Sequence, residues 1–115
     1  LFTGFVDNMD KTSFYGHADL FIYPSLYEGF GIPILEAMAM GTPVVCSDSS
    51  SMPEVGGDAA FYIDPLDIES IASGIETVLG NEDLKKSMID KGYNQIKKFS
   101  WDESAEKLKT LYMSI

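Results

Sequence analysis

Short apolar runs alternate with segments of helical spacing along most of this chain. Four of these runs predict strands, because each is compact, mainly apolar and followed by turn-forming residues. The strands are expected over residues 1–6, 20–23, 44–47 and 59–63. The first of them ends at Asp7 and Asn8, which are turn and N-cap residues.

The segments between and after these runs predict helices over residues 10–17, 33–40, 68–79, 82–99 and 102–115. Pro33 suits a first helical turn, where its missing N–H costs little, and Gly41 ends that helix. Asp67 is expected to cap the helix over 68–79, whose apolar residues recur at helical spacing. Ser100 or Asp102 caps the last helix.

Strands that alternate with helices imply a parallel sheet covered on both faces. The predicted fold class is therefore α/β, with a Rossmann-like parallel sheet of about four strands and flanking helices. We expect residues 1–115 to form a single, partial domain, of which residues 82–115 are a helical C-terminal tail.

The charge pattern narrows the possible functions. A net charge of −10 argues against nucleic acid as a partner, because such proteins present a basic face. Residues 1–80 contain twelve acids but only one lysine, Lys11, and the chain has no arginine. No stretch approaches the roughly 20 apolar residues of a membrane span. The lone Cys46 excludes an internal disulfide and a cysteine-based zinc cluster, and it favours the cytoplasm.

Two carboxylates, Glu28 and Glu36, stand on either side of a glycine-containing loop and a helix start. Glu36 is the only charged residue between Ile32 and Val45, and an ion in an apolar run usually has a partner. Ligands of parallel sheets bind beyond the carboxyl ends of strands, where this loop lies. The helix start favours an anion, so the segment predicts a sugar or nucleotide site.

The runs at 18–25, 28–31, 33–39 and 41–45 together resemble the donor-binding half of retaining glycosyltransferases with the GT-B fold. That large family includes sucrose synthases, bacterial glycogen synthases and many lipopolysaccharide mannosyl- and glucosyltransferases. The resemblance covers roughly residues 2–79. One departure is the run Ser49-Ser50-Ser51-Met52, which replaces a Gly-Gly pair common before Pro-Glu in the family.

The resemblance implies a role for each position of the motif. Glu28 is the candidate catalytic residue, contacting hydroxyls of the transferred sugar near the reacting centre, without being assigned as a nucleophile. Glu36 would accept hydrogen bonds from the ribose hydroxyls of the donor. The remaining substrate-binding positions would act through the loop amides or the main chain near the nucleoside, and they are Gly29, Phe30, Gly31 and Leu35.

The implied reaction moves a hexose from a nucleotide-diphosphate sugar to an acceptor with retention, and it needs no metal or other cofactor. The implied partners are an N-terminal acceptor domain and an upstream part of this domain, neither of which lies in this chain. We therefore expect the chain alone to be inactive and to self-associate through an unpaired sheet edge. The full-length protein is expected in the cytoplasm, either free or associated with a membrane.

A second interpretation is a non-catalytic half-domain that binds a nucleotide or a partner chain. The absence of arginine favours it, because phosphate-binding enzymes normally supply fixed cations. The intact Glu28 and Glu36 favour the enzyme for the parent protein. Each site residue also has an ordinary structural alternative, with Glu28 and Glu36 as surface charges, Gly29 and Gly31 as turn glycines, and Phe30 as a packing residue.

Overall fold

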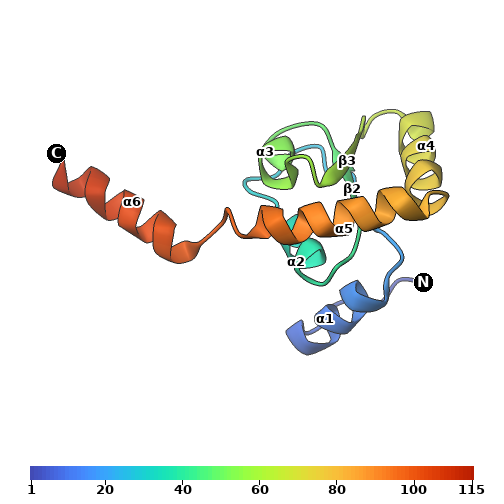
Figure 1. Cartoon of the computed structure of the whole chain (residues 1–115), viewed down its shortest axis with the longest axis horizontal. Helices are drawn as coiled ribbons and strands as arrows, with labels where there is room; N and C mark the ends of the chain where they lie inside the picture. Colours follow the sequence, from blue (N-terminus) through green and yellow to red (C-terminus); the bar gives the residue numbers. More distant parts are fainter.

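The computed structural model describes the whole chain, residues 1–115, as a small parallel sheet flanked by helices (Figure 1). Its elements follow in the order α1 (Asn8–His17), β1 (Phe21–Tyr23), α2 (Ile32–Ala39), β2 (Val44–Ser47), α3 (Met52–Gly56), β3 (Ala60–Ile63), α4 (Ile68–Leu79), α5 (Glu82–Ile96) and α6 (Trp101–Met113). The α/β class and the parallel sheet predicted from the sequence are confirmed.

The three strands pair in the order β1-β2-β3, so β2 is central and fully buried. Val44 pairs with Phe21 of β1 and with Ala60 of β3 in a parallel register. The helix α2 connects β1 to β2, and α3 connects β2 to β3. Parallel strands need such crossover connections, which place helices on the faces of the sheet.

Side chains of β2 alternate between two apolar layers. Val44 and Cys46 pack with the buried residues of α2 and α3, which are Ile34, Ala37, Met38, Met52 and Val55. Val45 instead packs with Ile63, Val78 of α4 and Met88 of α5 on the opposite face. Covering both faces explains why the strands are apolar runs without an exposed polar side.

Local signals in the sequence account for most of the helix starts. Pro33 lies in the first turn of α2, as predicted. The Asp67 carboxylate accepts a hydrogen bond from the Glu69 amide and caps α4, and the Ser100 hydroxyl accepts one from the Glu103 amide at the start of α6. These caps satisfy amides that have no partner inside their helices.

The predicted strand over residues 1–6 is wrong, and the sheet has three strands rather than about four. Leu1, Phe2 and Phe5 are almost fully exposed, and no neighbouring strand pairs with them. Gly4 also adopts a positive φ of 67°, which interrupts an extended backbone. An apolar composition cannot form a strand without a partner that satisfies its backbone.

The short helix α3 was not predicted from the sequence. It begins at Met52, carries Pro53 in its first turn and buries Met52 and Val55 against the sheet. The Pro53-Glu54 pair was the available signal, because both residues favour a first helical turn.

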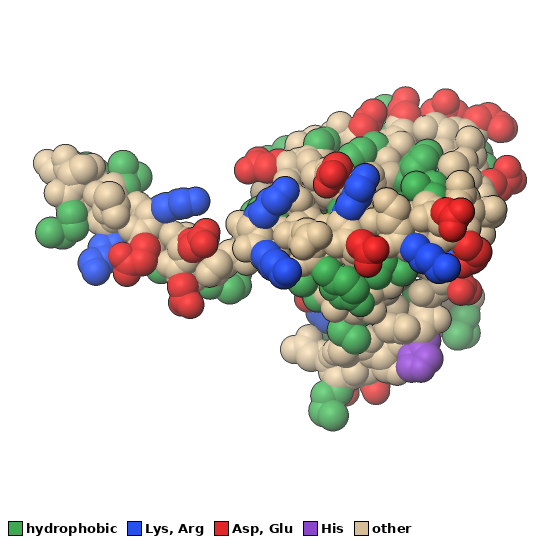
Figure 2. Space-filling model, viewed as in Figure 1, with side chains coloured by type: hydrophobic (Ala, Val, Ile, Leu, Met, Phe, Trp, Pro, Cys, Tyr) green, Lys and Arg blue, Asp and Glu red, His purple; other side chains and the backbone are tan.

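The last helix stands apart from the body of the molecule. Figure 1 shows α6 projecting to one side, and none of its residues is buried. The molecule is accordingly elongated, with extents of 51 × 31 × 30 Å. Figure 2 shows acidic and basic side chains interspersed over α5 and α6 on this face. No helix combines the length and the apolar character needed to cross a bilayer.

Ser47, at the end of β2, has a fully buried hydroxyl without a hydrogen-bond partner. An unpaired buried hydroxyl lowers stability, so Ser47→Ala is expected to raise the free energy of unfolding by up to about 1 kcal/mol. Thr42→Val is the matched control, because the buried Thr42 hydroxyl donates to the Tyr15 carbonyl at 2.6 Å. Urea unfolding should show that Thr42→Val lowers the free energy of unfolding by about 1 kcal/mol. A loss of stability in Ser47→Ala as large as in Thr42→Val would contradict the expectation.

Candidate functional site

The loop between β1 and α2 contains three consecutive backbone amides without a partner in the chain. It follows the carboxyl end of β1, and Gly31 caps the N-terminus of α2 with a φ of 92°. That left-handed conformation is available to glycine at little cost and strains other residues. The amides of Gly29, Phe30 and Gly31 donate no hydrogen bond within the chain. Three unpaired amides at a helix N-terminus form a favourable environment for an anion.

Glu28 lies in the same loop, immediately before these amides. Its carboxylate accepts a hydrogen bond of 2.7 Å from the Ser25 hydroxyl. The Ser25 hydroxyl and then the neighbouring Tyr23 hydroxyl hold the pKa of Glu28 below its ordinary value. Glu28 is therefore an anion at neutral pH, with lone pairs left over for donors on a ligand.

A run of three serines, residues 49–51, holds this loop in place from the segment after β2. The Ser50 hydroxyl accepts from the Glu28 amide at 3.2 Å and donates to the Glu28 carbonyl at 2.7 Å. The Ser51 hydroxyl lies 3.1 Å from the Glu28 carbonyl and 3.0 Å from that of Phe30, which are both acceptors. The serine side chains, which stand where the family commonly has Gly-Gly, thus hold the backbone at Glu28 by hydrogen bonds.

Ser50 makes these bonds from a left-handed conformation, with a φ of 59°. Ser50→Ala loses both bonds and keeps the strain, so it is expected to lower the free energy of unfolding by about 1–2 kcal/mol. Ser50→Gly loses the same bonds but relieves the strain, so its loss should be smaller. Urea unfolding measures both, with Ser87→Ala on the exposed side of α5 as a control that leaves stability unchanged. If Ser50→Gly proves less stable than Ser50→Ala, strain at this position is not significant.

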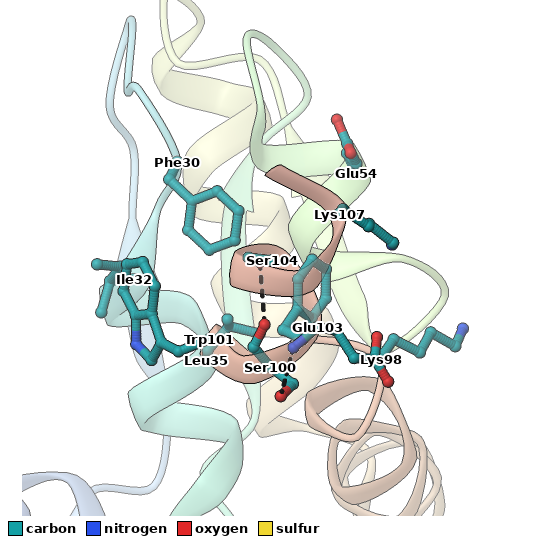
Figure 3. Close-up of a pocket in the computed structure, with 11 residues that line it drawn as sticks. Phe30, Ile32, Leu35, Glu54, Lys98, Ser100, Trp101, Glu103, Ser104 and Lys107 are labelled. Carbon is teal, nitrogen blue, oxygen red and sulfur yellow. Dashed lines mark hydrogen bonds between the residues drawn. The ribbon is translucent and has the colours of Figure 1, made fainter. Parts of the chain in front are cut away.

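Phe30 and Leu35 line a cavity of about 610 Å³. It lies between the start of α2 and residues 98–100, which lead into α6. Figure 3 shows Phe30 above the first turn of α6 in this view and the Trp101 indole beside Ile32. The Phe30 ring is 44% exposed and packs edge-to-face on Phe99, with ring centroids 5.6 Å apart. The Phe30 side chain therefore has a packing role, while its amide stays free.

Glu36 lines a different cavity, of about 360 Å³, between α1 and α2. Its carboxylate accepts from Lys11 Nζ at 3.1 Å and from the Tyr15 hydroxyl at 3.0 Å. Neither of these two cavities is lined by both Glu28 and Glu36. These two cavities therefore do not bring Glu28 and Glu36 together in one cleft.

Several residues of this site were missed in the sequence. Lys11 and Tyr15 follow an ordinary helix pattern, and nothing in their spacing indicates a partner on α2. The serine run departs from the family pattern, but nothing in its spacing indicates contacts with Glu28. In each case the partner lies more than 20 residues away along the chain.

Other reactive side chains are not assembled into a centre. No three or more His, Cys, Asp or Glu side chains come together in an arrangement that could hold a metal ion. Burial raises the pKa of the Cys46 thiol to about 12, so this cysteine is a protonated core residue at neutral pH.

Known proteins show sequence similarity to most of this chain. A family model described as glycosyl transferases group 1 matches residues 1–95. The chain is 45% identical over 101 residues to the O-antigen chain mannosyltransferase B of Escherichia coli, covering 88% of this chain and 26% of that protein. It is 33% identical over 99 residues to the MMP alpha-(1->4)-mannosyltransferase of Mycolicibacterium hassiacum. That alignment covers 83% of this chain and 24% of that protein.

A similar fold is found in the sucrose-phosphate synthase of Thermosynechococcus elongatus, with a TM-score of 0.82 at 28% identity. That alignment covers 99% of this chain and 29% of the synthase. The chain thus spans about a quarter of the length of the relatives it matches.

Proposed function

Because this chain belongs to the glycosyl transferases group 1 family, we propose that it is the donor-binding part of a retaining hexosyltransferase. Its donor would be a nucleotide-diphosphate sugar, and its acceptor would bind to a domain outside this chain. The observation that carries the proposal is the row of unpaired amides from Gly29 to Gly31, next to the ionised Glu28. Such a surface combines donors for a diphosphate with an acceptor for sugar hydroxyls.

The leaving diphosphate would be stabilised at the N-terminus of α2. The free amides and the helix dipole favour the negative charge that develops as the glycosidic bond breaks. Lys11 is already paired with Glu36, and residues 1–80 hold no other lysine or arginine. The family resemblance implies that further cations for the diphosphate come from the upstream part of the domain. We propose that these groups together replace a metal.

Glu28 would accept hydrogen bonds from hydroxyls of the transferred sugar near the reacting carbon. Charge-assisted bonds of this type are stronger than neutral ones, and they orient the sugar for departure of the diphosphate. The serine run keeps the loop rigid, so little ordering is needed when the donor binds. Glu36, in the neighbouring cavity, would accept hydrogen bonds from the ribose hydroxyls. The main chain at Leu35 would lie near the nucleoside.

The relatives named above as mannosyltransferases make a mannosyl donor the first to test. We expect the cytoplasm as the place of the reaction. The 115-residue chain alone would self-associate through an unpaired edge of its sheet, at β1 or β3. The chain alone should be inactive and should bind nucleotide sugars weakly, because the upstream cations and the acceptor domain are absent from it.

The test uses the protein expressed at the full length that its gene encodes, called the full-length protein below. Calorimetric titration with GDP-mannose, UDP-glucose and ADP-glucose, followed by assay of sugar transfer to acceptor glycans, should show binding of one donor and turnover with it. Binding without turnover on any acceptor would favour the non-catalytic half-domain. The absence of binding to every nucleotide sugar would overturn the proposal.

A further inference from the structure

The Glu36 carboxylate is held at both oxygens by side chains from another helix. Lys11 Nζ donates to Oε1 at 3.1 Å, and the Tyr15 hydroxyl donates to Oε2 at 3.0 Å. Both donors come from α1, more than 20 residues before Glu36, so α1 and α2 are joined at this point. A carboxylate held at both oxygens cannot rotate freely about its last torsion.

The Tyr15 hydroxyl is itself well anchored. Its ring packs edge-to-face on Phe21 of β1, with centroids 5.2 Å apart, and its carbonyl accepts a hydrogen bond of 2.6 Å from Thr42. Burial and then the hydrogen bond to Glu36 raise the pKa of Tyr15 above its ordinary value, so it stays a protonated donor. The position of Oε2 is therefore determined by the sheet as well as by α1.

Lys11 and Glu36 are both partly open to solvent, with side-chain exposures of 39% and 33%. An ion pair this exposed contributes little to stability, since solvent screens it. Positioning of the carboxylate is therefore a better explanation of the pair than stabilisation of the fold. The cavity beside it, of about 360 Å³, is also lined by Asn8, Thr12 and Met40.

An ionised carboxylate offers about four acceptor positions, two on each oxygen. Lys11 and Tyr15 use one position on each oxygen of Glu36, which leaves one on each. Two remaining acceptors on one planar group are suited to two adjacent hydroxyl groups. The vicinal 2′- and 3′-hydroxyls of a ribose present that pair of donors.

We propose that Lys11 and Tyr15 are positioning residues that orient the Glu36 carboxylate to bind the vicinal ribose hydroxyls of the donor. This inference rests on the proposed function, because it needs a nucleotide ligand in the cavity between α1 and α2. In this arrangement Lys11 and Tyr15 would contact Glu36 and not the reacting atoms. Lys11 serves the carboxylate rather than the diphosphate, which explains how a strongly acidic segment uses its only lysine.

The test measures discrimination between ribose and deoxyribose in the full-length protein. Dissociation constants are compared for GDP and 2′-deoxy-GDP, and for UDP and 2′-deoxy-UDP. The wild type should prefer the ribonucleotide of its own base about tenfold, as expected for a hydrogen bond to a charged group. Lys11→Ala and Tyr15→Phe should each reduce this preference to about twofold, while Lys11→Arg should restore it.

Matched variants separate positioning from general stability. Tyr15→Phe keeps the ring that packs on Phe21 and removes only the hydroxyl. Lys91→Ala removes a lysine paired at 3.9 Å with Asp58, away from the cavity, and should leave the preference unchanged. Thermal unfolding of each variant shows whether the fold is retained.

Each outcome has a distinct meaning. A wild type that prefers the ribonucleotide while Lys11→Ala and Tyr15→Phe keep that preference would overturn the positioning role and leave the proposed function intact. A wild type that binds nucleotides without the preference would overturn the ribose role of Glu36 and the inference with it. A protein that binds no nucleotide would remove the proposed function itself.

Discussion

Glu28→Gln in the full-length protein is expected to lower kcat by about 10²–10³-fold, the effect of removing one well-placed charge-stabilising group from an active site. The substitution keeps the size of the side chain and its ability to accept a hydrogen bond from Ser25. It removes the negative charge that would strengthen bonds to the sugar hydroxyls as the diphosphate departs. Initial-rate measurements with the best donor of the panel give kcat and KM separately.

The fold should tolerate this change, because Glu28 lies in an exposed loop and its backbone is held by Ser50 and Ser51. Thermal unfolding of Glu28→Gln should therefore match the wild type within a few degrees. Glu69→Gln, on the exposed first turn of α4, is the control and should retain full activity. Turnover of Glu28→Gln equal to that of the wild type would rule out a catalytic role for Glu28.

Glu36→Ala is expected to raise the KM for the donor about 10–100-fold, with a smaller change in kcat. A hydrogen bond to a charged group contributes enough binding free energy for such a change, and ribose lies away from the reacting carbon. The loss of stability should be small, since the ion pair with Lys11 is partly exposed. Initial rates over a range of donor concentrations separate KM from kcat.

The contrast between the two acids is the informative part of these measurements. Glu28 should act mainly on turnover, and Glu36 mainly on donor affinity, because they would contact different parts of one ligand. Their placement in the structure, with Glu36 but not Glu28 lining the cavity next to α1, is consistent with this division. A Glu36→Ala variant with an unchanged KM and a reduced kcat would contradict it.

Most local elements could be predicted because their signals lie within a few residues. Asp67, Ser100 and Pro33 mark helix starts through their own side chains, and the buried strands are continuous apolar runs. The strand expected over residues 1–6 shows the limit of this reasoning. Apolar residues permit a strand, but a paired neighbour is needed to satisfy its backbone, and no strand pairs with this segment.

The sequence likewise indicates some residues of the candidate site but not their contacts. Glu28, Gly31 and Glu36 could be singled out by residue type and spacing. Their surroundings could not, since Ser50 reaches Glu28 across 22 residues and Lys11 reaches Glu36 across 25. Spacing along a chain indicates which face of an element a residue occupies, but not which distant side chain meets it there.

The amino-acid sequence by itself determined the α/β class, the helix caps, and a glycine-containing loop between two acids at the end of a strand. These depend on backbone preferences and apolar periodicity, which act over a few residues. The tertiary structure decided that the loop amides remain unpaired, that serines hold the Glu28 loop, and that α1 holds Glu36. Such contacts depend on how the helices pack against a shared sheet, and packing joins residues far apart in the chain.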